Sequence, residues 1–250
     1  MPRPPSSHSS SRPLPGLACL IASVWLTGCA PLPPQAGAAA DLTNCSTGGL
    51  TPADNTRLAG IEQLIRDGKS YAALAQLDSL KSEAPGVKLA RADALRRIDR
   101  LDEANALYLS LAQGSHCLEG RAQHGLGLVA AQQGRLTDSV RHLRQARQVL
   151  PMDLRVRNDL GYALLLSDQW DEARFEFLTV LDLSEKEPRA ARNLVLLTFR
   201  QGQDEKAREL GRRLGLDAAS IDRLALQATQ AEPLASVSQP PSTDKPTAQP

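Results

Sequence analysis

Cysteine and histidine are the side chains in this 250-residue sequence best suited to metal binding or nucleophilic chemistry. The four cysteines are Cys19, Cys29, Cys45 and Cys117, and the histidines in or beside helical patterns are His116, His124 and His142. None of them forms a His-Glu-x-x-His pair or a Cys-x-x-Cys with zinc spacing. The sequence therefore predicts no metal site.

Signatures of the common enzyme classes are also absent. The sequence holds no Gly-x-Ser-x-Gly elbow, glycine-rich phosphate loop or dinucleotide fingerprint. Aromatic residues make up 3%, which is low for an enzyme with one large core. The 29 Lys and Arg oppose 28 Asp and Glu, so no global charge favours nucleic acid or an anionic membrane. We expect a non-enzymatic protein-binding chain with no cofactor and no small-molecule substrate.

The first 28 residues have the pattern of a bacterial secretory signal. Arg3 and Arg12 precede an apolar run, residues 17–26, that is too short to span a bilayer. Leu26-Thr27-Gly28-Cys29 then resembles the lipobox of bacterial lipoproteins, in which the cysteine is acylated and becomes the new amino terminus. The resemblance implies a lipid anchor on Cys29 and, because Ala30 follows, the periplasmic face of the outer membrane. The alternative is an ordinary signal peptide in which a cysteine occurs by chance.

Cys45 and Cys117 would remain in the mature chain. In an oxidising periplasm they could close one disulfide, and so long a loop would contribute about 4 kcal/mol in the chain-entropy view. Free thiols, with Cys117 buried as a small apolar residue, are the equal alternative, because no sequence rule returns the segment around Cys45 to Cys117.

The elements that would position any site are helices in a repeated pattern. Segments that begin at Gly120, Leu154 and Pro188 align with one another, and both intervals are 34 residues. The first helix of each copy is expected to turn at Gly134, Asp168 and Gly202, and the second helix to cross it closely at Ser139, Ala173 and Ala207. Val195 and Gly211 depart from the size pattern of the other copies.

This pattern resembles tetratricopeptide repeat proteins. The resemblance implies an all-α fold, an α-solenoid of antiparallel helix pairs with a C-terminal capping helix. The expected division is a signal peptide at 1–28, a flexible tether at 29–50, the solenoid at 51–229 with its best repeats at 120–153, 154–187 and 188–216, and a disordered tail at 230–250. Thr51 and Asp217 are the expected N-caps of the first helix and of the capping helix, in which Ile221, Leu224 and Leu226 form the apolar face.

The resemblance also implies a groove lined by positions 2, 5, 9, 12 and 13 of each repeat. The predicted groove residues are Arg121, His124, Arg155, Asn158, Tyr162, Arg189 and Arg192. Such a basic and apolar ladder suits an extended or helical peptide with acidic groups. The alternative is that these arginines are only solvent-exposed residues at the start of each helix, since arginine is a good helix former. Trp170, Phe175 and Phe177 are interpreted as core residues rather than ligand contacts.

Two segments resemble a narrower family, the TadD-type lipoproteins of tight-adherence (Flp) pilus systems. They are Val156 to Leu164 with the Trp170-Asp171-Glu172-Ala173-Arg174 that follows, and Arg189 to Leu194 one repeat later. The resemblance implies a pilotin-like assembly factor whose partners belong to the pilus secretion machine, with the outer-membrane secretin as one of them. The alternatives are a type IV pilotin, a subunit for outer-membrane protein assembly, or a scaffold or regulator of cell-wall hydrolases.

Overall fold

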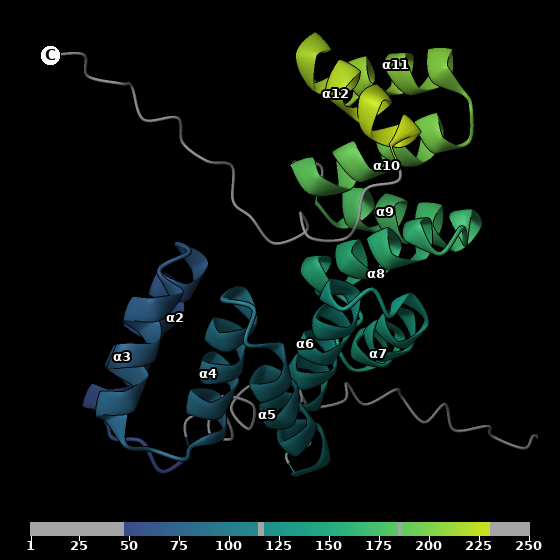
Figure 1. Ribbon diagram of the computed structural model, residues 1–250. Coiled ribbons are helices and arrows are strands. Elements are labelled where there is room, and N and C mark those ends of the chain that lie inside the picture. Colours follow the sequence, from purple (N-terminus) through teal and green to yellow (C-terminus); the bar gives the residue numbers. More distant parts are fainter. Residues whose placement is uncertain (1–47, 115–117, 185–186, 231–250) are drawn as a thin grey trace, which may run out of the picture. The chain divides into compact units, whose positions relative to one another are not determined.

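The chain forms consecutive pairs of helices (Figure 1), seen in a computed structural model that describes residues 48–114, 118–184 and 187–230. The pairs are α2 (Pro52–Arg66) with α3 (Ser70–Leu80), α4 (Pro85–Arg97) with α5 (Leu101–Gly114), α6 (Glu119–Gln132) with α7 (Leu136–Val149), α8 (Leu154–Leu166) with α9 (Trp170–Leu183), and α10 (Pro188–Arg200) with α11 (Asp204–Arg213); α12 (Ala218–Thr229) follows. The prediction of an all-α stack of antiparallel helix pairs with a C-terminal capping helix is confirmed.

The signal peptide, nearly all of the expected tether and the tail beyond Gln230 lie outside the described residues. The same is true of Cys29, Cys45 and Cys117, so the lipid site and the disulfide stay predictions. In the part of the chain that is described, no helix is long and apolar enough to cross a membrane.

Each pair turns at one residue with left-handed backbone conformation. These residues are Gly68, Asp99, Gly134, Asp168 and Gly202, with φ between 57° and 76°. At each turn the residue after it donates its N–H to a carbonyl five residues back, as Arg135 does to Ala130 at 2.9 Å. This Schellman arrangement satisfies carbonyls that the end of a helix would otherwise leave without a partner. The turns predicted at Gly134, Asp168 and Gly202 are confirmed.

The same turn sets the packing within each pair. The fifth residue after the turn is Ala73, Ala104, Ser139, Ala173 or Ala207, and every one of them is fully buried. A small residue is needed here because the second helix crosses the first closely at this point. The close crossings predicted at Ser139, Ala173 and Ala207 agree with this burial.

Glycines on the first helices make room for large residues of the second. A Cβ on Gly127 would lie 2.6 Å from Cγ of Leu143, and one on Gly161 would lie 2.6 Å from Cε1 of Phe177. In the last pair the sizes are exchanged, because the corresponding positions are Val195 and Gly211. Both are buried, so these two departures compensate each other.

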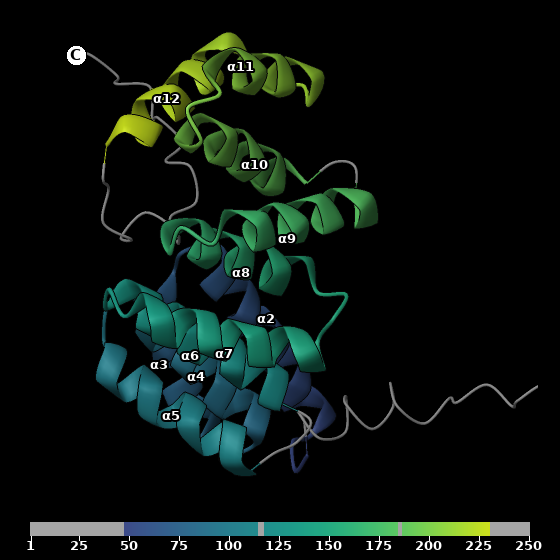
Figure 2. The same ribbon diagram turned by 90° about the vertical axis from the view of Figure 1, so that its right-hand side faces the viewer.

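Gly211 also admits the capping helix. A Cβ on Gly211 would lie 2.8 Å from Cγ1 of Ile221 in α12. Seen in Figure 2, α12 lies against α10 at the C-terminal end of the stack. Its N-cap is Asp217, which accepts a hydrogen bond from the N–H of Ser220 at 2.7 Å, as predicted. The N-cap predicted at Thr51 is likewise confirmed, with the N–H of Asp54 at 3.1 Å.

Two predicted core positions were wrong. Leu226 is 62% exposed, whereas Ile221 and Leu224 of the same helix are buried. Five residues of helix place Leu226 about 140° around the helix axis from Ile221, on nearly the opposite face, whereas three or seven residues return close to the face of Ile221. Phe175 is 60% exposed, while Phe177 is fully buried and Trp170 packs partly buried against the same core.

Candidate functional site

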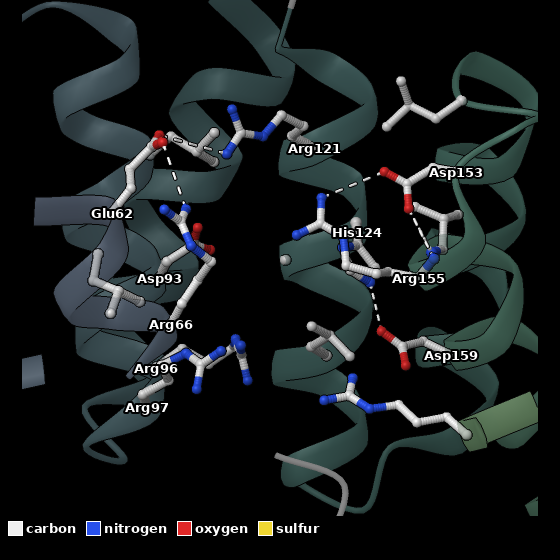
Figure 3. A pocket seen from close by; sticks show the side chains of 17 residues that line it. Glu62, Arg66, Asp93, Arg96, Arg97, Arg121, His124, Asp153, Arg155 and Asp159 are labelled. Atoms are coloured by element: carbon white, nitrogen blue, oxygen red, sulfur yellow. Dashed lines mark hydrogen bonds and ion pairs between the residues drawn. The ribbon is translucent and has the colours of Figure 1, made fainter. Parts of the chain in front are cut away.

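Within the described residues, the first helices of the five pairs contribute to a groove of about 190 Å³ (Figure 3). Its charged lining consists of six arginines, Arg66, Arg96, Arg97, Arg121, Arg155 and Arg189, and four acids, Glu62, Asp93, Asp153 and Asp159. Its apolar lining consists of Ile65, Leu89, Leu128, Leu150 and Val156, with His124 and Gly125 completing the wall. The groove is therefore both basic and partly apolar.

Four of the seven predicted groove residues line this groove: Arg121, His124, Arg155 and Arg189. The other three do not. Asn158 is buried between helices, Tyr162 packs partly buried against the core, and Arg192 is exposed outside the lining. Their contact with a ligand stays a prediction.

The half of the groove that α2 and α4 build was not predicted from the sequence. Counted back from the turn residue, the predicted positions 9, 12 and 13 fall on Glu62, Ile65 and Arg66 in the first pair, where Gly68 is the turn. In the second pair, with Asp99 as the turn, they fall on Asp93, Arg96 and Arg97. All six line the groove. The interval from Gly68 to Asp99 is 31 residues and that from Asp99 to Gly134 is 35, so counting back in strict steps of 34 residues reaches only Arg97 among them.

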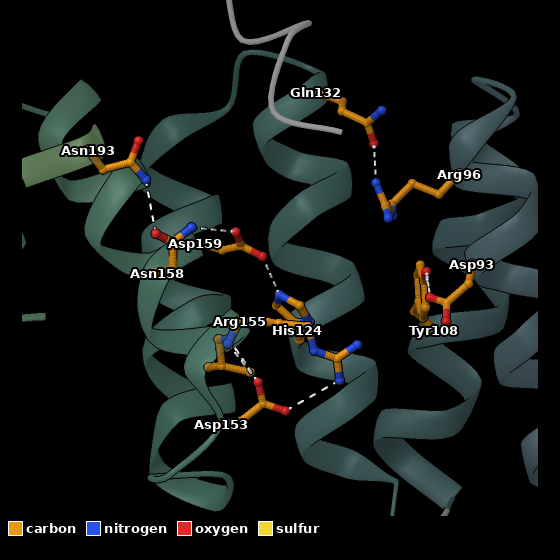
Figure 4. A network of polar contacts seen from close by, with 11 residues as sticks. Asp93, Arg96, Tyr108, His124, Gln132, Asp153, Arg155, Asn158, Asp159 and Asn193 are labelled. Atoms are coloured by element: carbon orange, nitrogen blue, oxygen red, sulfur yellow. Dashed lines mark hydrogen bonds and ion pairs between the residues drawn. The ribbon is translucent and has the colours of Figure 1, made fainter. Parts of the chain in front are cut away.

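A chain of polar contacts crosses three first helices along this surface (Figure 4). The side-chain amide of Asn193 donates to Oδ1 of Asn158 at 3.0 Å, and that of Asn158 to Oδ1 of Asp159 at 3.4 Å. Nε2 of His124 lies 2.7 Å from Oδ2 of Asp159. Partners from neighbouring pairs thus satisfy these polar groups, and they hold α6, α8 and α10 in register.

Three of the four groove carboxylates have hydrogen-bond donors other than arginine. Asp93 accepts from the hydroxyl of Tyr108 at 2.5 Å, and Asp159 contacts His124. Asp153 is the N-cap of α8 and accepts from the N–H groups of Arg155 and Val156. Burial alone would raise the pKa of Asp153, but these hydrogen bonds and the charge of Arg155 outweigh it, so the pKa is lowered.

The carboxylate partners of three groove arginines, by contrast, are more distant. Arg66 and Arg121 lie 4.0 Å and 3.8 Å from the carboxylate of Glu62, and Arg155 lies 3.4 Å from that of Asp153. Several ion pairs outside the groove are closer. Examples are Arg100 with Glu103 at 2.6 Å, Arg135 with Asp138 at 2.7 Å and Arg144 with Glu172 at 2.8 Å. The groove therefore retains positive charge that an incoming anion can pair with.

Within the described ranges, no group of three His, Cys, Asp or Glu residues is placed so that it could hold a metal ion.

Known proteins with similar sequences or folds are also helical repeat proteins. The chain is 38% identical over 201 residues to the TPR repeat-containing protein PA4299 of Pseudomonas aeruginosa PAO1, which covers 80% of this chain and 79% of that protein. Among solved structures, MamA AMB-1 has a TM-score of 0.52 at 21% identity, over 67% of this chain and 98% of that one. MamA 41-end from Desulfovibrio magneticus RS-1 has a TM-score of 0.52 at 16% identity, over 69% and 97%. No model of a protein family matches the chain.

A stack of antiparallel helix pairs whose first helices line one groove defines a class, the helical repeat solenoids. The identity to the Pseudomonas protein, which extends over four fifths of this chain, makes the assignment specific. The chain belongs to the tetratricopeptide repeat (TPR) proteins.

Proposed function

We propose that this chain is a lipid-anchored, non-enzymatic adaptor whose groove binds an acidic segment of a protein partner. The observation that carries the proposal is the excess of basic side chains in the groove, where six arginines meet four acids that mostly have other donors. The partly exposed apolar side chains of Leu128 and Leu150 line the same groove. A peptide with alternating acidic and apolar residues would complement both.

The cellular setting is the envelope of a bacterium. The lipobox that ends at Cys29 supports an anchor on the periplasmic face of the outer membrane, with no spanning helix required. The similarity of residues 156–164 and 189–194 to TadD-type lipoproteins supports a role in Flp pilus assembly. The adaptor would act there as a pilotin-like helper, and the partner would be a component of the secretion machine, the secretin first among them.

Charge reversal in the groove tests the binding role. Arg121→Glu combined with Arg155→Glu replaces attraction by repulsion at two exposed side chains, and like-charge contacts at an interface cost several kcal/mol. We expect secretin multimers and surface pili to be lost from cells that carry the double variant, while its helical circular dichroism stays unchanged.

The matched control is Arg212→Glu combined with Arg213→Glu, which reverses two exposed charges on the second helix α11. We expect this variant to assemble pili normally. Equal loss in both variants, or normal assembly with the groove variant, would show that the partner docks elsewhere.

Lipid attachment is tested separately with Cys29→Ser, because the thiol is the atom that receives the acyl chain. We expect incorporation of radiolabelled palmitate to disappear and the protein to leave the outer-membrane fraction. Cys45→Ser is the matched control and should keep both. Undiminished label in the Cys29 variant would end the lipoprotein assignment.

A further inference from the structure

The outward face of α9 carries two apolar side chains between two acids. Phe175 and Leu178 are 60% and 44% exposed, and Asp171 and Asp182 are exposed as well. At about 100° per residue, all four lie within about 60° of one another around the helix axis, on a line about 16 Å long. These four residues are called the α9 stripe. The buried side of α9 packs against α8 and α10.

The other second helices show that the fold does not require large apolar residues on this face. Phe175 and Leu178 lie seven and ten residues after the turn at Asp168. The residues at the same two positions of the other described pairs are Ala75 and Asp78, Ala106 and Leu109, Arg141 and Arg144, and Glu209 and Arg212. Adjoining exposed apolar side chains, unlike single ones, are typical of binding surfaces. The α9 stripe is therefore a candidate docking surface.

The charge along this surface is negative. The ion pairs that α9 forms within the described residues use Glu172 and Glu176, not Asp171 or Asp182. Arg174, the basic residue of this helix, donates to a glutamine at the α10–α11 turn. Both ends of the α9 stripe thus keep a carboxylate that an incoming cation can pair with.

A second copy of the chain would complement this surface poorly. A two-fold axis would place the α9 stripe of one copy against the same stripe of the other. In an antiparallel arrangement Asp171 would face Asp182, and in a parallel arrangement each acid would face its own copy. Like charges at an interface oppose association. An anionic membrane surface is disfavoured for the same reason.

We propose that the α9 stripe binds a basic amphipathic helix of another protein. The apolar side chains of that helix would pack on Phe175 and Leu178, and its Lys or Arg residues would pair with Asp171 and Asp182. The site is separate from the groove, because no residue of α9 lines the groove. The chain could then hold two partners at once, one on each surface.

A labelled peptide tests the proposal on the full-length chain. The Lys peptide has about 15 residues, with Leu at helical spacing on one face, Lys elsewhere and fluorescein at one end. The Glu peptide, in which Glu replaces every Lys, is the matched probe. Fluorescence anisotropy should show saturable binding of the Lys peptide and much weaker binding of the Glu peptide. Phe175→Ala should weaken binding of the Lys peptide by about fivefold or more, because aromatic side chains are frequent anchors of interfaces.

Salt separates the charged part of the contact from the apolar part. Asp171→Asn combined with Asp182→Asn should weaken binding at low salt only, because salt screens the charges. Phe175→Ala should weaken binding at low and high salt alike. The controls are Asp102→Asn and Leu109→Ala, which change exposed residues at equivalent positions of α5, and both should bind like the parent. An unchanged melting temperature shows that each variant is folded.

The opposite results would overturn the proposal. These are parent-like binding of the Lys peptide by Phe175→Ala, an equal loss with Leu109→Ala, or equal binding of the Lys and Glu peptides by the parent. A dimer in analytical ultracentrifugation that Phe175→Ala dissociates would assign the surface to a second copy instead. Phosphatidylglycerol vesicles that bind the parent but not Phe175→Ala would assign it to a membrane.

The charge reversal in the groove keeps the two sites apart. Binding of the Lys peptide should survive Arg121→Glu combined with Arg155→Glu, since neither residue belongs to the α9 stripe. Loss of that binding in the reversal variant, with parent-like binding by Phe175→Ala, would move the peptide to the groove and remove this site.

Discussion

At the scale of single residues, Gly161 is the sharpest test of how the pairs pack. A side chain at this position meets the ring of Phe177, since even a Cβ would lie 2.6 Å from Cε1. Gly161→Leu should therefore lower the free energy of unfolding by about 1–3 kcal/mol, the usual cost of overpacking a core. Urea denaturation measures this change.

The control is Gly60→Leu on α2, where a Cβ has nothing within 4 Å. A leucine there should not destabilise the fold, because it removes a glycine from a helix without any clash. A Gly161 variant as stable as the parent would contradict the close crossing of α8 and α9.

Glu176 is the second residue on which stability depends. Its side chain is 4% exposed and lies 2.6 Å from Nη1 of Arg157 and 3.2 Å from Nη1 of Arg147, so it joins α9 to α8 and α7. Glu176→Gln leaves these two guanidinium groups without their counter-charge, and we expect a loss of about 3–5 kcal/mol. Glu172→Gln, which breaks the exposed pair with Arg144, should cost about 0–1 kcal/mol in the same urea experiment. Equal losses would show that burial of the triad is unimportant.

At the scale of elements, the start of α8 depends on the charge of Asp153. Its pKa is lowered in the folded protein, so its contribution to stability is present above the ordinary value of 3.8 and is lost as pH falls through the lower folded value. Asp153→Asn keeps a capping oxygen but removes the charge. We expect the variant to be less stable by roughly 0.5 kcal/mol at pH 7 and equal to the parent once the pH lies below the folded-state pKa of Asp153. A difference that is the same at both pH values would contradict the charge effect.

The capping helix depends on the exchange of sizes in the last pair. Gly211→Leu would place a large side chain where Ile221 of α12 lies, so α12 should detach while the earlier pairs stay folded. Hydrogen exchange should show faster exchange of the α12 amides alone. Adding Ile221→Ala should restore part of their protection, and failure to do so would separate the two positions.

Sequence patterns reached the helix pairs, the turns at Gly134, Asp168 and Gly202, and both predicted N-caps, because glycine and capping chemistry is local. They did not predict the residues of α4 that line the groove. In that region the first two intervals between turns are 31 and 35 residues, whereas the groove positions were predicted only from the three regularly spaced copies. Nor does the sequence show that the side chain of Asn158 is hydrogen-bonded to that of Asn193, because this contact joins two repeats. The exposure of Phe175 was likewise not predicted from the sequence.

At the scale of the whole molecule, we propose that the partner docks in the groove that the first helices of the five described pairs share. Arg155 is 67% exposed there, and the lining around it holds more arginines than acids. Leu226, 62% exposed on the capping helix α12, is the best matched position outside the groove. Photo-crosslinking in living cells can compare these two surfaces directly.

The measurement places a benzophenone amino acid at Leu128, which lines the groove, or at Leu226, and identifies the adducts after irradiation. The account predicts an adduct with a pilus secretion component from Leu128, abolished by the Arg121→Glu and Arg155→Glu reversal, and none from Leu226. Adducts from Leu226 alone, or a Leu128 adduct that survives the charge reversal, would contradict it.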